Sequence, residues 1–121
     1  MADIEKIQRE ALLQLFTELQ VDKIPLKMQL TNDDDIRLTY INDIRKRKRA
    51  LHFLVKSPED YRKLTEEADQ LRLRFEFIYK DNIKYAFETK TWELSSDMIW
   101  VKFPEFVHRY QRRKLFRLEA T

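Results

Sequence analysis

The sequence contains no glycine among its 121 residues, and this absence constrains the fold more than any motif does. Glycine adopts positive φ without steric cost and lets a backbone approach a phosphate group closely. The Walker A loop and the GxGxxG loop of dinucleotide-binding proteins both depend on it. Nucleotide binding of these usual kinds is therefore excluded, and the turns must be made by Asn, Asp, Ser and Pro.

The length and composition fit one cytoplasmic domain. A chain of 121 residues supports a single, modest core. Cysteine is absent, which excludes disulfides and thiolate metal sites and fits a reducing cytoplasm. No run of about eighteen apolar residues exists to span a membrane, and residues 1–6 lack the apolar stretch of a secretion signal. We expect a cytoplasmic protein without membrane insertion.

An amphipathic helix is predicted at the N-terminus. Apolar residues recur there at spacings of three and four, which places them on one helical face. Asp3 is the expected N-cap, and the helix should end before Pro25 because the residue before a proline favours extended conformations. The apolar positions are Ile4, Ile7, Ala11, Leu12, Leu15, Phe16 and Leu19.

Beyond Pro25 apolar residues alternate with polar ones, which is typical of half-buried strands. Six strands are predicted, at residues 26–30, 36–40, 51–55, 71–79, 83–94 and 98–103. Ser57-Pro58-Glu59-Asp60 predicts a short connector helix. Because Trp92 and Leu94 have the opposite parity to the apolar residues before them, a bulge near Thr89–Thr91 would bring both sets to the core. We expect a mainly β fold: a small six-stranded antiparallel barrel, split-barrel-like, with an N-terminal helix and one connector helix.

The sequence offers no catalytic or metal-binding constellation. His52 and His108 are the only histidines, and neither has clustered carboxylates beside it, whereas a metal site needs three or four converging ligands. Ser57, Ser95 and Ser96 stand where caps and turns need a hydroxyl. We expect a binding module that is not an enzyme and has no catalytic residue, metal or cofactor.

Basic residues gather in two places. Residues 101–121 carry six Lys or Arg residues and two acidic residues. The rest of the chain carries 18 Lys or Arg residues and 19 acidic residues. The other cluster is the run 45–49, Arg-Lys-Arg-Lys-Arg, which the flanking alternation places at a hairpin tip. Such a run typically forms a solvated edge that resists sheet-to-sheet aggregation, and nucleic-acid binding is the alternative. Most aromatic residues fall on inward positions, which argues against nucleic acid.

Arginines of the C-terminal segment are the candidate ligand-binding residues. Guanidinium groups bind phosphate oxygens bidentately and pair with the O6/N7 edge of guanine. Arg113 and Arg117 are four residues apart, so they lie on one face whether the segment is helical or extended. Taken alone, this RxxxR spacing is a weak signal.

Residues 111–120 resemble the opening of a PilZ domain, the family that binds cyclic di-GMP through an RxxxR motif and a later (D/N)xSxxG motif. The residues before them resemble the YcgR-type N-terminal domain of flagellar brake proteins, in the leading helix, the Ile24-Pro25-Leu26 strand opening and the aromatic-rich stretch before the arginines. The resemblance implies a barrel domain at 1–104 and an interdomain segment with the start of a PilZ domain at 105–121. It also implies that Arg113 and Arg117 bind cyclic di-GMP, assisted by Arg112.

On this resemblance the chain is a non-enzymatic regulatory domain of a cyclic di-GMP effector that controls flagellar motility. Flagellar motor or stator proteins are then its partners, and the basal body is a possible location within the cytoplasm. The (D/N)xSxxG motif is missing, since the sequence ends at Thr121 and lacks glycine. We expect a fragment that holds half a binding site, or else a stand-alone domain without ligand function. The alternatives are a basic small-barrel nucleic-acid-binding domain, using residues 45–49 and the tail, and a plain protein-interaction domain.

Overall fold

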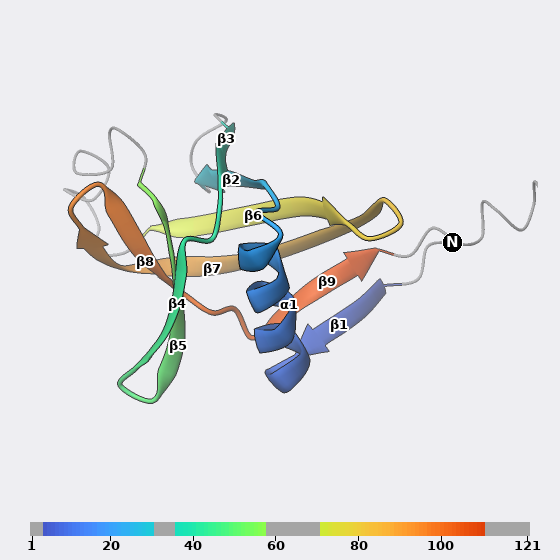
Figure 1. Ribbon diagram of the computed structural model, residues 1–121, viewed down its shortest axis with the longest axis horizontal. Helices are drawn as coiled ribbons and strands as arrows, with labels where there is room; N and C mark the ends of the chain where they lie inside the picture. Colours follow the sequence, from blue (N-terminus) through green and yellow to red (C-terminus); the bar gives the residue numbers. More distant parts are fainter. Residues whose placement is uncertain (1–3, 31–35, 58–70, 111–121) are drawn as a thin grey trace, which may run out of the picture.

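The computed structural model describes residues 4–30, 36–57 and 71–110. These residues form one helix and nine strands (Figure 1). The elements are β1 (Ile4–Gln8), α1 (Arg9–Val21), β2 (Leu26–Leu30), β3 (Ile36–Thr39), β4 (Asp43–Arg47), β5 (Ala50–Lys56), β6 (Arg72–Tyr79), β7 (Ile83–Ser95), β8 (Met98–Lys102) and β9 (Phe106–Tyr110). The predicted connector helix lies outside the described residues.

All strand pairs are antiparallel, and the sheet runs in the order β3-β2-β6-β7-β8-β5-β4. The long strand β7 joins its two halves. One edge of β7 pairs with β6, while the other pairs first with β9 and then with β8; β9 in turn pairs with β1. The predicted mainly β fold with one N-terminal helix is confirmed. In the described part of the chain no ladder joins β3 to β4, so closure into a barrel stays a prediction.

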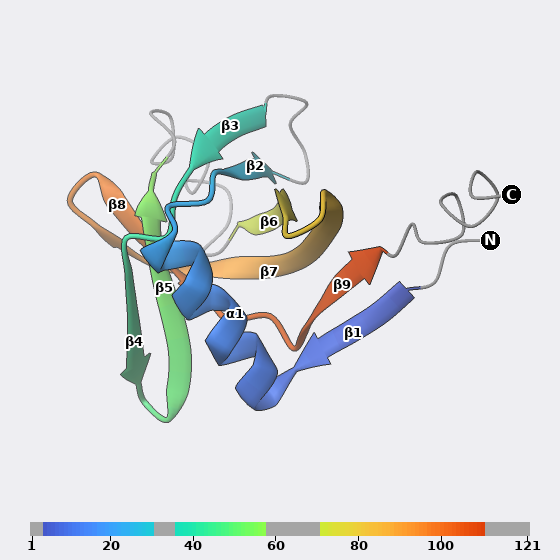
Figure 2. The same ribbon diagram turned by 45° about the vertical axis from the view of Figure 1, so that its right-hand side comes forward.

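Helix α1 lies between the β4–β5 ribbon and the β1–β9 pair (Figure 2) and contributes one apolar face to the core. Its four buried residues are Leu12, Leu15, Phe16 and Leu19. Phe16 is fully buried, and its ring meets those of Phe53, Phe87 and Phe103 at centroid distances of 5.2, 5.2 and 4.5 Å. Aromatic rings thus fill the interior, and burial of this large apolar area is the main force that holds helix and sheet together.

The predicted start of the helix is wrong. Residues 4–8 form strand β1, which pairs along its whole length with β9, and the residue at the N-cap is Gln8. Arg9 has a φ of 55°, a left-handed conformation that separates strand from helix. The spacing of Ile4 and Ile7 suits a helix, but pairing with β9 satisfies the backbone of this segment instead.

The six predicted strands correspond to β2, β3, β5, β6, β7 and β8. The count of six is wrong, because β1, β4 and β9 also belong to the sheet. Strand β4 contains residues 45–47 of the basic run, so the predicted hairpin is present but its tip is confined to Lys48 and Arg49. Strand β9 lies beyond the domain boundary expected at residue 104 and continues the same sheet.

The predicted bulge in β7 is present, slightly later than expected, as a register shift between Thr91 and Glu93. Thr91 takes the inward position. It is fully buried, its Oγ1 accepts a hydrogen bond from the Leu71 N–H (3.0 Å), and its own N–H donates to the Leu71 carbonyl (2.9 Å). The prediction that Trp92 joins the core is wrong, since its ring stacks on His52 at 4.2 Å, outside the core cluster.

No helix within the described ranges is long and apolar enough to cross a membrane; α1 has only 13 residues.

Candidate functional site

The predicted ligand-binding residues Arg112, Arg113 and Arg117 lie outside the described residues. The structure shows where their segment begins, at Tyr110, the last residue of β9. Strand β9 is held on both sides at this point, because Tyr110 pairs with Ile4 of β1 and with Lys84 of β7. The arginine segment therefore starts from a fixed end of the sheet (Figure 1).

A stripe of aromatic rings on β9 leads to the arginine segment. Phe106, His108 and Tyr110 alternate with the buried Val107. The ring of His108 lies 4.8 Å from that of Phe106 and 6.2 Å from that of Tyr110. Lysines cover both ends of the stripe, since the Lys6 Nζ lies 4.6 Å from the Phe106 centroid and the Lys84 Nζ 5.8 Å from the Tyr110 centroid. Cations over ring faces are attracted by the ring quadrupole. The stripe therefore combines aromatic rings with positive charge at both of its ends.

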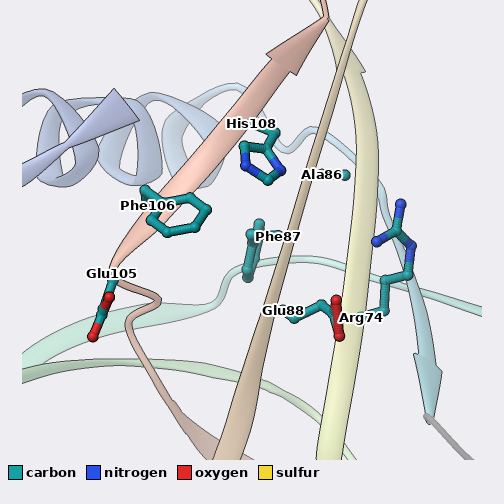
Figure 3. A pocket seen from close by; sticks show the side chains of 7 residues that line it. All are labelled: Arg74, Ala86, Phe87, Glu88, Glu105, Phe106 and His108. Atoms are coloured by element: carbon teal, nitrogen blue, oxygen red, sulfur yellow. The ribbon is translucent and has the colours of Figure 1, made fainter. Parts of the chain in front are cut away.

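Beside this stripe the sheet has an open hollow of about 270 Å³ (Figure 3). Its floor includes Ala86, whose register partners are Glu76 on β6 and His108 on β9. The lining residues are Arg74, Ala86, Phe87, Glu88, Glu105, Phe106 and His108. Ligand pockets for small molecules usually measure about 300–1,000 Å³, and Arg74 is paired with Glu76 at 3.0 Å. The hollow has room for one planar group and cannot alone enclose a dinucleotide.

Polar contacts fasten α1 to the β6–β7 hairpin. The Tyr79 hydroxyl donates to Asp22 Oδ2 (2.6 Å) and lies 3.2 Å from Glu18 Oε1, while Lys80 Nζ lies 2.8 Å from the same Glu18 oxygen. The hydrogen bond from Lys80 lowers the pKa of Glu18, and the bond to Asp22 raises the pKa of Tyr79. The charges are solvent-exposed, so these contacts position the helix more than they stabilise the fold.

A second cationic surface lies on the β4, β5, β7 and β8 half of the sheet. The guanidinium carbon of Arg47 lies 5.2 Å from the Trp92 ring centroid and 5.6 Å from the Trp100 centroid, and that of Arg45 lies 5.6 Å from the Trp100 centroid. We call Arg45, Arg47, Trp92 and Trp100, with the turn Lys48-Arg49, the ribbon face. The ribbon face was not predicted from the sequence, because Trp92 was expected to lie in the core. The available signal was the position of Trp100 between the inward residues Ile99 and Val101.

His52 lies beneath this surface. It is only 3% exposed, its ring stacks on Trp92, and its Nδ1 has no hydrogen-bond partner within the described ranges. Burial lowers the pKa of His52, and the nearby charges of Lys102 and Arg47 lower it further, against an opposing contribution from the Ala50 backbone. The neutral imidazole is therefore the form that the fold favours.

Replacing His52 with phenylalanine should make stability less dependent on pH. Because the folded-state pKa lies below the ordinary value of about 6.5, wild-type stability is complete above that value and falls as the pH drops toward the folded-state pKa. The slope in this interval is at most about 1.4 kcal/mol per pH unit for one proton. Urea unfolding at pH 7, 6 and 5 measures it. Equal slopes for wild type and His52→Phe would contradict this role of His52.

The described residues contain no group of three His, Cys, Asp or Glu that could hold a metal ion. His52 lies on β5 and His108 on β9, strands that do not pair. No protein-family model matches the chain, and no curated protein shows significant similarity to it.

Proposed function

We propose that the chain is the N-terminal regulatory domain of a cyclic di-GMP effector that controls flagellar motility. The observation that carries this proposal is the direct succession of β9 and the RxxxR segment, with Arg113 and Arg117 a few residues beyond a strand paired on both sides. The resemblance to PilZ and YcgR-type sequences supplies the ligand, and the mainly β fold with an N-terminal helix is compatible with it.

The chemistry assigned to the segment is that of guanidinium forks. Arg113 and Arg117 bind phosphate oxygens and guanine edges, with Arg112 adding a third cation. A ligand bound here restrains the chain that leaves β9, and the five-residue ladder with β1 transmits that restraint into the sheet. The domain acts without catalysis: it turns ligand occupancy into a changed arrangement relative to a following PilZ domain. Flagellar motor or stator proteins at the basal body are the proposed partners.

Calorimetric titration of cyclic di-GMP into the native-length protein tests the assignment. We expect binding by the wild type and a loss of at least about 100-fold for Arg113→Ala/Arg117→Ala, since a hydrogen bond to a charged group contributes about 1.5–3 kcal/mol. The matched control is Lys48→Asn/Arg49→Gly, which removes the same charge from the β4–β5 turn and should bind as the wild type does. Unchanged affinity after the arginine substitutions, or no binding by the wild type, would refute the proposal.

A further inference from the structure

We infer that the ribbon face binds single-stranded nucleic acid. This inference concerns a different surface from the arginine segment and does not rest on the proposed function. In both views the tip of the β4–β5 ribbon and the end of β9 lie on different sides of the molecule (Figures 1 and 2). The basic run at 45–49 therefore has to be judged by its own surroundings, apart from the tail.

The tryptophan rings of the ribbon face lie beside its cations. Trp92 and Trp100 are the only tryptophans in the chain, and both contact Arg47. Trp92 is half-buried, and Trp100 is only 6% exposed because it lies beneath the arginines. In register, Arg45 of β4, His52 of β5 and Lys102 of β8 form one row across three neighbouring strands. The face thus presents accessible arginine planes that are held over indole rings on a rigid sheet, and such planes can stack on unpaired bases while nearby cations bind their phosphates.

The arginines of the ribbon face are held in place by their neighbours. A free arginine side chain loses about 2 kcal/mol of rotamer entropy when it is fixed. Here the indole rings hold both guanidinium groups, and Asp43 accepts a 2.8 Å hydrogen bond from Arg45 Nε. Both remain accessible, with side chains 61% exposed for Arg45 and 40% for Arg47. Ordered guanidinium planes can stack on bases, and their edges can donate to phosphates.

The turn between β4 and β5 carries two further cations. Lys48 and Arg49 connect β4 and β5 as a two-residue loop, with φ values of 50° and 67°. Such a turn strongly favours Asn-Gly, because other residues are strained at positive φ. Two long cationic side chains occupy these positions instead. Positive φ also occurs at six other described residues of this glycine-free chain, so the backbone conformation does not by itself mark a site. The turn supports the inference through its charge, because both cations lie beyond the last paired residues of the ribbon.

Nucleic acid fits this surface better than the other anionic partners do. An acidic peptide would neutralise the cations but would leave the ring and guanidinium stack unused. An anionic lipid surface would attract Lys48 and Arg49 at the ribbon tip but would likewise leave the ordered guanidinium planes without a stacking partner. Within the described ranges Arg45 pairs with Asp43 at 2.8 Å, and Arg47 lies 3.9 Å from Glu93. A phosphate can readily compete for such an exposed, loosely paired cation.

Binding can be measured with a fluorescein-labelled 15-nucleotide oligouridine, by anisotropy at low salt and by quenching of tryptophan fluorescence. The second signal reports the ribbon face alone, because both tryptophans belong to it. We expect the oligonucleotide to bind, to quench the tryptophans, and to bind more weakly as the salt concentration rises.

Three variants locate the contact. Arg45→Gln/Arg47→Gln should weaken binding by roughly tenfold or more, as the loss of stacking on one or two bases would. Lys48→Asn/Arg49→Gly preserves the turn and should reduce the steepness of the salt dependence by about one for each lost phosphate contact. The matched control Lys23→Gln/Lys27→Gln removes two charges at and before β2 and should bind as the wild type does.

The inference is overturned if the oligonucleotide does not bind at low salt, or if both ribbon variants bind as tightly as the wild type. It is also overturned if affinity is lost only on Arg113→Ala/Arg117→Ala, which would place the contact on the tail. Equal affinity and equal quenching with inorganic polyphosphate, a 15-residue polyglutamate or phosphatidylglycerol vesicles would also overturn the inference, because the surface would then bind any polyanion.

Discussion

Replacing Phe16 with alanine should lower the free energy of unfolding by about 3–5 kcal/mol, the usual cost of removing a fully buried phenylalanine ring. Phe16 is 0% exposed and contacts rings on β5, on β7 and just beyond the end of β8. Because domains are typically stable by only about 5–15 kcal/mol, much of the stability would be lost. Urea unfolding followed by circular dichroism measures it.

Leu13→Ala is the matched control on the same helix. Leu13 is 38% exposed, so its truncation creates little cavity and should cost far less than that of Phe16. A small loss for Phe16→Ala, comparable to that of Leu13→Ala, would mean that α1 does not close the core in the way described.

The double substitution Lys48→Asn/Arg49→Gly should raise the free energy of unfolding by about 1–2 kcal/mol. Both residues have positive φ, which costs an ordinary residue roughly 1–2 kcal/mol and glycine almost nothing. Asn-Gly is the preferred pair for a two-residue turn of this kind. The gain should appear in urea unfolding as a higher midpoint with an unchanged slope.

Lys48→Gln/Arg49→Gln separates the backbone from the charges. It removes the same two cations but keeps a Cβ atom at both positive-φ positions. Its free energy of unfolding should therefore rise little above that of the wild type. If the Gln pair stabilises as much as the Asn-Gly pair, repulsion within the basic run is the cause. Strain in the turn would then not be the source of the gain.

Much of the sheet could be predicted from the sequence, because alternation reports burial directly. In β6, Leu73, Phe75 and Phe77 are buried while Arg72 and Ile78 are exposed, and the alternation predicted this arrangement. The turns at Asp81-Asn82 and Ser96 were also predictable, since short polar residues tolerate positive φ.

The missed strands lack that signal. Strand β4 has the sequence Asp-Ile-Arg-Lys-Arg, which shows no alternation of apolar and polar residues. Its arginine side chains cover the tryptophans, and this contact depends on the positions of Trp92 and Trp100 in the fold. Strand β1 has its isoleucines three apart, and what makes it a strand is its partner β9, about a hundred residues away. Long-range pairing of this kind overrides local propensity.

The candidate sites divide in the same way. The RxxxR segment could be found from residue types alone, since its chemistry depends on charge and spacing. The ribbon face could not be predicted from residue types alone, because it depends on which face of β7 carries the Trp92 side chain. That side is set by the bulge and by the burial of Thr91, neither of which can be placed to the residue from alternation.

The pairing of β1 with β9 has a mechanical consequence. Ile4 and Tyr110 face each other at one end of the ladder, so tension between them opens the pair one rung at a time instead of shearing all rungs together. In the described part of the chain β1 has no other partner strand, whereas β9 stays attached to β7. Peeling β1 away, with Arg9 as the pivot, would leave an unpaired edge on β9, and such an edge can accept a strand from another chain.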